Sequence, residues 1–183
     1  MTMNYLKVVP ETITDGDGLR TAIYVAGCEN YCKGCFNPES WDYSAGKPLT
    51  DEVIDNIITD FNTNTLIEGI SVLGGDPFAP KNREDFLDFL KKLRLGGIPN
   101  LWAWTGYTLE ALQEEKTARE CLKYIDTLVD GPYIESLRDA ELAFRGSSNQ
   151  RIIHLQSIKY APSKPSRSSL NLESASGLTI TRA

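Results

Sequence analysis

Short apolar runs alternate with amphipathic segments along most of this chain, and that alternation limits the folds it can adopt. Apolar runs predict strands at residues 21–26, 67–73, 101–104 and 125–129, and an edge strand at 152–155. Apolar residues recur at helical spacing over residues 49–61 and 86–93. This order predicts an α/β fold with a mostly parallel sheet and right-handed crossovers. The strand–helix units are too few for an eight-fold barrel, so we expect a partial, open β/α barrel.

Residues typical of helix ends delimit the predicted helices. Thr50, Asn82 and Thr108 are expected at the starts of the first three helices. Thr117 and Glu120 are expected to form a capping box for a short fourth helix, and Gly96-Gly97 to end the second.

The unusual loops all follow predicted strands. They are a cysteine-rich segment after the first strand, a Gly74-Gly75-Asp76-Pro77 turn, a Thr105-Gly106-Tyr107 stretch and an Asp130-Gly131-Pro132 turn. Because the carboxyl ends of parallel strands meet at one edge of a sheet, we expect these loops to form one site.

Composition excludes several classes of function. The 183 residues carry 25 acidic and 19 basic side chains, a formal net charge of −6. Broad nucleic-acid binders usually carry net positive charge, so we expect no nucleic-acid partner. The single histidine excludes a site that needs two, such as an HExxH zinc site. No signal-peptide h-region and no stretch near 18 apolar residues is found, so we expect a cytoplasmic protein without a membrane partner.

The four cysteines divide into a group of three and a single residue. Cys28, Cys32 and Cys35 have the spacing C-x3-C-x2-C, whereas Cys121 lies far away in a predicted helix. Clustered thiols favour metal ligation over a disulfide framework. Three cysteines can hold three irons of a 4Fe–4S cluster and leave the fourth iron open. The alternative is a zinc knuckle completed by Cys121 or His154, although Cys121 is more typical of a small buried residue and His154 of a structural one.

Composition changes near the C-terminus. Residues 1–155 are expected to form the compact domain, and residues 156–183, rich in Ser and Pro, a flexible tail.

The ordered set of motifs resembles the radical S-adenosylmethionine (SAM) superfamily, and within it the activating proteins of anaerobic ribonucleoside-triphosphate reductase. The resemblance covers about residues 4–155 and rests on segments 15–20, 27–37, 74–77, 102–107, 128–132 and 145–150. The wider superfamily often has an aromatic residue at the position of Gly34 and a glutamate at that of Asp76; this chain follows the narrower group at both.

The resemblance implies a radical SAM type of open barrel and a defined chemistry. Cys28, Cys32 and Cys35 would ligate one 4Fe–4S cluster, whose open iron SAM chelates. Reductive cleavage of SAM would yield a 5′-deoxyadenosyl radical that abstracts hydrogen from a glycine of the reductase, producing a glycyl radical. A flavodoxin-like protein is the implied electron donor. No side chain is expected to act as an acid or base.

The expected SAM-binding residues follow the strands. Gly34 and Phe36 would lie near the adenine; Gly74, Gly75 and Asp76 would accept from the ammonium; Thr105 and Asp130 would hold ribose or methionine groups.

Each of these residues also has a structural interpretation. Phe36 is compatible with a core position, Gly74 to Pro77 with a plain turn, Thr105 with a loop before a helix and Asp130 with a turn. Asp17 and Arg20 are expected either near the partner's glycine-bearing peptide or in a salt bridge. Residues 145–150 are expected in a solvated turn or a closing loop.

Two other functions remain open from the sequence. The chain would activate a different glycyl-radical enzyme, or it would be a non-catalytic, zinc-stabilised binding module.

Overall fold

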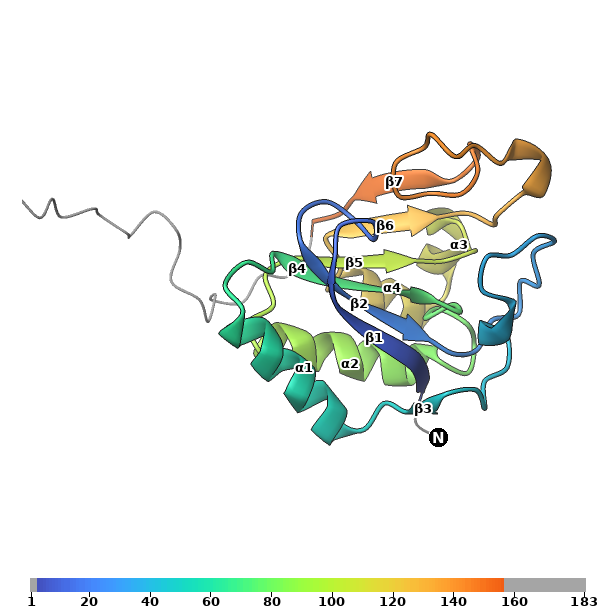
Figure 1. Ribbon diagram of the computed structural model, residues 1–183. Coiled ribbons are helices and arrows are strands. Elements are labelled where there is room, and N and C mark those ends of the chain that lie inside the picture. The colour runs from blue at the N-terminus through green and yellow to red at the C-terminus, as the bar shows by residue number, and fades with distance from the viewer. Residues whose placement is uncertain (1–2, 157–183) are drawn as a thin grey trace, which may run out of the picture.

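The computed structural model describes residues 3–156, and these form an open seven-stranded sheet with helices on one face (Figure 1). The strands are β1 Asn4–Thr12, β2 Arg20–Val25, β3 Lys47–Pro48, β4 Gly69–Gly74, β5 Leu101–Trp104, β6 Thr127–Asp130 and β7 Arg151–His154. The helices are α1 Asp51–Thr63, α2 Arg83–Leu95, α3 Leu109–Glu114 and α4 Lys116–Leu122, with short 3-10 turns η1 Pro38–Ser40 and η2 Glu135–Leu137.

The sheet order is β3-β1-β2-β4-β5-β6-β7. The four central strands, β2, β4, β5 and β6, run parallel, whereas β1 and β7 are antiparallel to their neighbours β2 and β6. The predicted mixed α/β fold with an open, mostly parallel sheet is confirmed.

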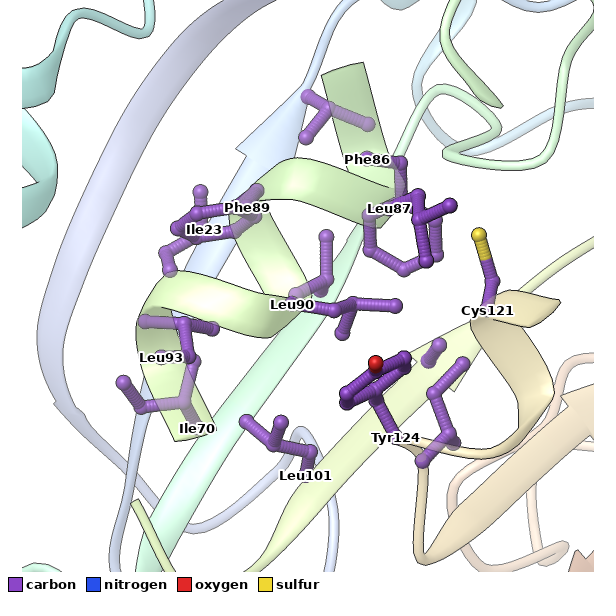
Figure 2. Close-up of a cluster of buried hydrophobic side chains, with 14 of the residues drawn as sticks. Ile23, Ile70, Phe86, Leu87, Phe89, Leu90, Leu93, Leu101, Cys121 and Tyr124 are labelled. Atoms are coloured by element: carbon purple, nitrogen blue, oxygen red, sulfur yellow. The ribbon is translucent and has the colours of Figure 1, made fainter. Parts of the chain in front are cut away.

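The core lies between the helices and the sheet. Apolar side chains of α2 pack against residues of β2, β4 and β5, among them Ile23, Ile70 and Leu101 (Figure 2). Phe86 and Phe78 meet edge to face, with ring centroids 5.2 Å apart. The helical spacing seen in the sequence therefore marks the face of α2 that covers the sheet.

The first antiparallel pair was not expected from the sequence. β1 pairs with β2, but its register shifts between Tyr5 and Lys7 and again between Val9 and Thr12. Such irregularities break the two-residue alternation that reveals a strand in sequence. β3 has only two residues and pairs with β1 through Asn4 and Tyr5.

Of the predicted helix caps, Thr50 and Thr108 are confirmed, Asn82 is confirmed in its position alone, and the Thr117–Glu120 capping box is wrong. Thr50 accepts from the amide of Val53, and Thr108 from that of Ala111. The Asn82 side chain makes no cap hydrogen bond and instead reaches the loops above the sheet. The capping box fails because the helix begins one residue before Thr117: Glu115 is the N-cap of α4, and Thr117 donates to Glu84.

None of the helices within residues 3–156 has the length and apolar character needed to span a bilayer. All of the predicted flexible tail 156–183 except its first residue lies outside the described residues, so the domain boundary near residue 155 stays a prediction.

Candidate functional site

A cavity of about 760 Å³ opens where the parallel strands end. Its walls come from the cysteine segment after β2, the turn after β4, the loop after β5 and the segment 131–150 after β6. These segments lie beyond the tips of the β2, β4, β5 and β6 arrows (Figure 1). The volume is in the range of sites that bind small molecules and cofactors. The predicted gathering of the loops at one edge is confirmed.

All three clustered cysteines line this cavity. Each is a free thiol of intermediate exposure. The amide of Cys35 donates to the carbonyl of Cys32 at 3.1 Å, and the amide of Cys28 to that of Trp41 at 3.2 Å. Gly34 has φ +73, a left-handed conformation that closes the tight turn between Cys32 and Cys35. The local backbone thus brings Cys28, Cys32 and Cys35 to the same cavity.

Amide groups approach two of the sulfurs. The side-chain nitrogen of Asn30 lies 3.6 Å from Cys28 Sγ. Burial raises the pKa of the Cys28 and Cys32 thiols, and the backbone amides of Asn30 and Tyr133 respectively oppose that rise. N–H groups aimed at sulfur stabilise the thiolate, which is the form that binds metal.

The fourth cysteine and the histidine do not line this cavity. Cys121 is fully buried in α4, among core side chains (Figure 2), and its Sγ donates to the carbonyl of Arg83 at 3.8 Å. Burial raises its pKa to about 12. His154 Nδ1 lies 3.1 Å from Thr127 Oγ1 on the edge strand pair. Neither residue therefore supplies the fourth ligand of the zinc knuckle weighed from the sequence.

The three thiols line one cavity and are not grouped around a single point. Within residues 3–156, no three His, Cys, Asp or Glu side chains are placed to hold one metal ion. In an iron–sulfur cluster, each cysteine binds a different iron, so the ligands are distributed around the cluster. Three thiols spread along a cavity wall fit that group.

The glycines after β4 allow the turn to pack against the cysteine segment. The amide of Gly75 donates to the carbonyl of Val25, and the amide of Asp76 to that of Gly27, both at 2.8 Å. A Cβ atom on Gly75 would lie 2.7 Å from the Gly27 oxygen. Gly74 has φ +105, and a Cβ there would lie 2.9 Å from Tyr24 Cα. Glycine is required here by contact between two chain segments.

Asp76 is the centre of a hydrogen-bond network beneath the cavity. Its Oδ2 accepts from Asn30 Nδ2 at 2.9 Å, Thr105 Oγ1 at 3.1 Å and the Gly106 amide at 3.0 Å. Its Oδ1 accepts from the Phe78 amide at 2.9 Å. Burial raises the pKa of Asp76, and these donors oppose the rise. The carboxylate joins the loops after β2, β4 and β5.

Six of the seven predicted SAM-binding residues line the cavity with the cysteines: Gly34, Phe36, Gly74, Gly75, Asp76 and Thr105. Phe36 is 95% exposed, so the core interpretation of its side chain is wrong. Thr105 is buried and donates to Asp76, and Thr108 takes the helix cap. The binding roles of these residues stay predictions.

Asp130 does not line the cavity. It is 1% exposed, its Oδ2 accepts from the Leu109 amide at 2.7 Å, and both of its oxygens accept from Arg151. Arg151 also forms an ion pair with Glu110. Asp130, the last residue of β6, therefore connects that strand to the start of α3 through the Leu109 amide. Its contact with SAM remains a prediction.

Arg20 is also held by the protein. Its guanidinium donates to Ser71 Oγ at 2.7 Å and to the carbonyls of Asp17 and Ile70, and it lies against the Trp102 ring. The alternative of a salt bridge with Asp17 is wrong, because Arg20 reaches the backbone carbonyl and not the carboxylate.

The segment 131–150 forms one wall of the cavity, of which the sequence indicated only residues 131–132 and 145–150. The indole of Trp104 donates to the Phe144 carbonyl at 2.8 Å, and Lys33 pairs with Glu135 at 3.0 Å. Gln150 Oε1 accepts from the amide of Gly146 at 2.9 Å, and its Nε2 donates to the Gly131 carbonyl. Arg145, Gly146 and Gln150 line the cavity, and a closing role for residues 145–150 stays a prediction. Asn30, Tyr133 and Glu135 were not singled out, because polar loop residues carry no periodicity.

Comparison with known proteins agrees with this site. A family model described as a 4Fe-4S single cluster domain matches residues 14–153, which include the three clustered cysteines.

Curated relatives share most of the chain. A protein of Haemophilus influenzae named "Anaerobic ribonucleoside-triphosphate reductase-activating protein" is 42% identical over 154 residues, which are 83% of this chain and 97% of that protein. Proteins of the same name from Escherichia coli K12 and enterobacteria phage T4 are 39% and 33% identical, over 84% and 82% of this chain and 100% and 93% of their own length.

Proposed function

The chain belongs to the family of anaerobic ribonucleoside-triphosphate reductase-activating proteins, and we propose that it activates such a reductase by generating a glycyl radical on it. The observation that carries the proposal is one cavity lined by the three cysteines and the Gly74-Gly75-Asp76 turn, in a chain with this family membership. We also propose that the open sheet is a partial barrel of the radical SAM type.

Cys28, Cys32 and Cys35 are the residues that would hold a 4Fe–4S cluster. A bound cluster would supply the electron that breaks the S–C5′ bond of SAM. Methionine would then leave, and the 5′-deoxyadenosyl radical would take a hydrogen atom from a glycine of the reductase. Because three cysteines line the cavity, one iron of such a cluster would have no protein ligand and would be open to SAM. The protein itself would bind and orient the cluster and SAM and exclude water from them.

The turn after β4 offers a backbone acceptor for the SAM ammonium. The Asp76 carboxylate already accepts four protein donors. The carbonyls of Gly74 and Asp76 accept from Ser40 and Asn82. We therefore assign the ammonium to the carbonyl of Gly75.

The remaining assignments follow the cavity wall. Gly34 and Phe36, beside the third cysteine, are proposed to face the adenine, and the exposed Phe36 ring offers an apolar surface for it. Thr105 is proposed to face the ribose or methionine. Asp130 keeps its proposed SAM contact only if it exchanges its bonds to Arg151.

No acid–base side chain is assigned. A flavodoxin-like protein in the cytoplasm is proposed as the electron donor.

The test is anaerobic reconstitution with iron and sulfide, followed by dithionite and SAM. We expect 5′-deoxyadenosine and methionine in equal amounts, and a glycyl doublet in the electron paramagnetic resonance (EPR) spectrum when the anaerobic reductase is added. The matched control is Cys28→Ala, which we expect to give neither. A colourless protein that carries zinc after anaerobic purification would contradict the proposal. A glycyl doublet that forms only on another glycyl-radical enzyme would show that the reductase is not the partner.

A further inference from the structure

The side chain of Asn30 lies between the sulfur of Cys28, a predicted cluster ligand, and the buried carboxylate of Asp76. Asn30 is the second residue after Cys28, within the C-x3-C spacing. Its side-chain nitrogen is 3.6 Å from Cys28 Sγ and 2.9 Å from Asp76 Oδ2. A primary amide has two N–H groups, so one nitrogen can donate to both atoms.

The surroundings determine which end of the amide faces the sulfur. Asp76 Oδ2 also accepts from Thr105 Oγ1 and the Gly106 amide, so it acts here as an acceptor. An acceptor selects the amide nitrogen of Asn30, not its oxygen. The same nitrogen is the atom near Cys28. The direction of the N–H toward the sulfur is therefore a consequence of the Asp76 network.

Gly106 provides the space for this amide. A Cβ atom at position 106 would lie 2.3 Å from Asn30 Nδ2 and 2.7 Å from its Cγ. Both contacts are far shorter than any tolerated by real side chains, so a residue larger than glycine would displace the amide. The loop after β5 thus acts on Asn30 in two ways. Thr105 and Gly106 donate to Asp76, which accepts from Asn30, and the lack of a side chain at Gly106 leaves room for the Asn30 amide.

We propose that Asn30 is a positioning residue that raises the reduction potential of the cluster held by Cys28, Cys32 and Cys35. This rests on the proposed function, because it needs the cluster. Reduction adds negative charge to the cluster and its sulfur ligands. An N–H group directed at Cys28 stabilises the reduced form more than the oxidised form. Asn30 also separates the cysteine from the Asp76 carboxylate, whose charge acts in the opposite direction.

The central variant is Asn30→Leu, which keeps the approximate shape and removes both N–H groups. We expect a more negative midpoint potential in anaerobic redox titrations of the reconstituted protein without SAM, followed by the EPR signal of the reduced cluster. Asn30→Asp places a carboxylate against Asp76 and the sulfur, and we expect a shift in the same direction.

Thr105→Val is the matched control. It removes another donor to Asp76 Oδ2 but does not reach Cys28. We expect its potential to stay near the wild-type value. A shift as large as that of Asn30→Leu would show that the potential follows the network as a whole, and this would overturn the role of Asn30.

A second route displaces the amide without removing it. If Asn30→Leu takes up little cluster, Gly106→Ala supplies the measurement, with the same expected shift. Unchanged potentials in loaded Asn30→Leu or Gly106→Ala overturn the inference. Failure of both to load, while Thr105→Val loads, overturns it in favour of a purely structural role. Wild-type protein that takes up no cluster overturns the proposed function as well.

Discussion

The side-chain amide of Asn82, just before α2, donates to the backbone carbonyl of Ala26 at the end of β2, 2.8 Å away. The same nitrogen lies 3.0 Å from the Asp76 carbonyl. Asn82 is 2% exposed. One side chain therefore joins the start of α2, the exit of β2 and the turn after β4, where the cavity begins.

Asn82→Asp tests this connection. It keeps the shape but replaces the donor with a carboxylate facing carbonyl oxygens. We expect a loss of about 1–3 kcal/mol in the free energy of unfolding, because buried acceptors lose their donor. Urea unfolding followed by tryptophan fluorescence measures it. Asn56→Asp, on the exposed face of α1, is the control and should change stability little. Equal effects of the two variants would contradict the assignment.

Cysteine substitutions separate the group of three from the fourth residue. Cys28→Ala, Cys32→Ala and Cys35→Ala should each prevent stable uptake of iron and sulfide, because each removes a ligand. Cys121→Ala should preserve it, since its thiol is packed in the core away from the cavity. Iron and sulfide analysis with visible absorption after reconstitution is the measurement. Loss of the cluster in folded Cys121→Ala would sink this division.

Arg94 holds the far end of the sheet through a buried ion pair. It is 1% exposed, lies 2.7 Å from Asp126 Oδ2 and donates to the Tyr124 and Ile98 carbonyls. Arg94→Met should lower the free energy of unfolding by about 3–5 kcal/mol, because Asp126 would be left charged and buried.

The control for this variant is Lys92→Met, on the same helix, whose ammonium pairs with the exposed Asp51. It should cost less than about 1 kcal/mol in urea unfolding. A cost for Arg94→Met no larger than that of Lys92→Met would refute a special contribution of the buried pair.

Alkaline pH should weaken the fold through Tyr24. Burial, together with the Asp15 carboxylate 3.1 Å from the hydroxyl, raises the pKa of Tyr24 from 10.0 to about 12. The folded state then holds a proton that the unfolded state loses, so this contribution is complete below pH 10.0 and disappears as pH rises to about 12. Tyr24→Phe should flatten that part of the stability profile in urea titrations. Parallel profiles for the two proteins would count against it.

Local pattern was sufficient for most of the elements. The strands containing Ile23, Ile70 and Leu128 are buried apolar runs, and α1 and α2 show helical spacing, because each buries one face against a layer of the core. β1 was missed, since its bulges remove the alternation. The Thr117–Glu120 box failed because Glu115, two residues earlier, takes the N-cap position.

The cavity wall was predicted more fully than its contacts. Spacing placed the three cysteines and the Gly74-Gly75 turn after parallel strands, and parallel strands bring such loops together. The spacing does not state which donor meets which acceptor. Asn82 was expected as a cap and turned instead to carbonyls 56 and 55 residues earlier in the chain.

The sequence by itself determined the order of the four parallel strands and the helices, the position of the three cysteines and the family, because these depend on local pattern and on motif order. The sequence also favoured a core position for Cys121, which the structure confirms. Only the tertiary structure decided that Asp130 faces Arg151 and that Asn30 lies between Cys28 and Asp76. The reason is physical. A buried polar group must find its partner in three dimensions, and that partner can lie on any segment that folding brings within hydrogen-bond distance.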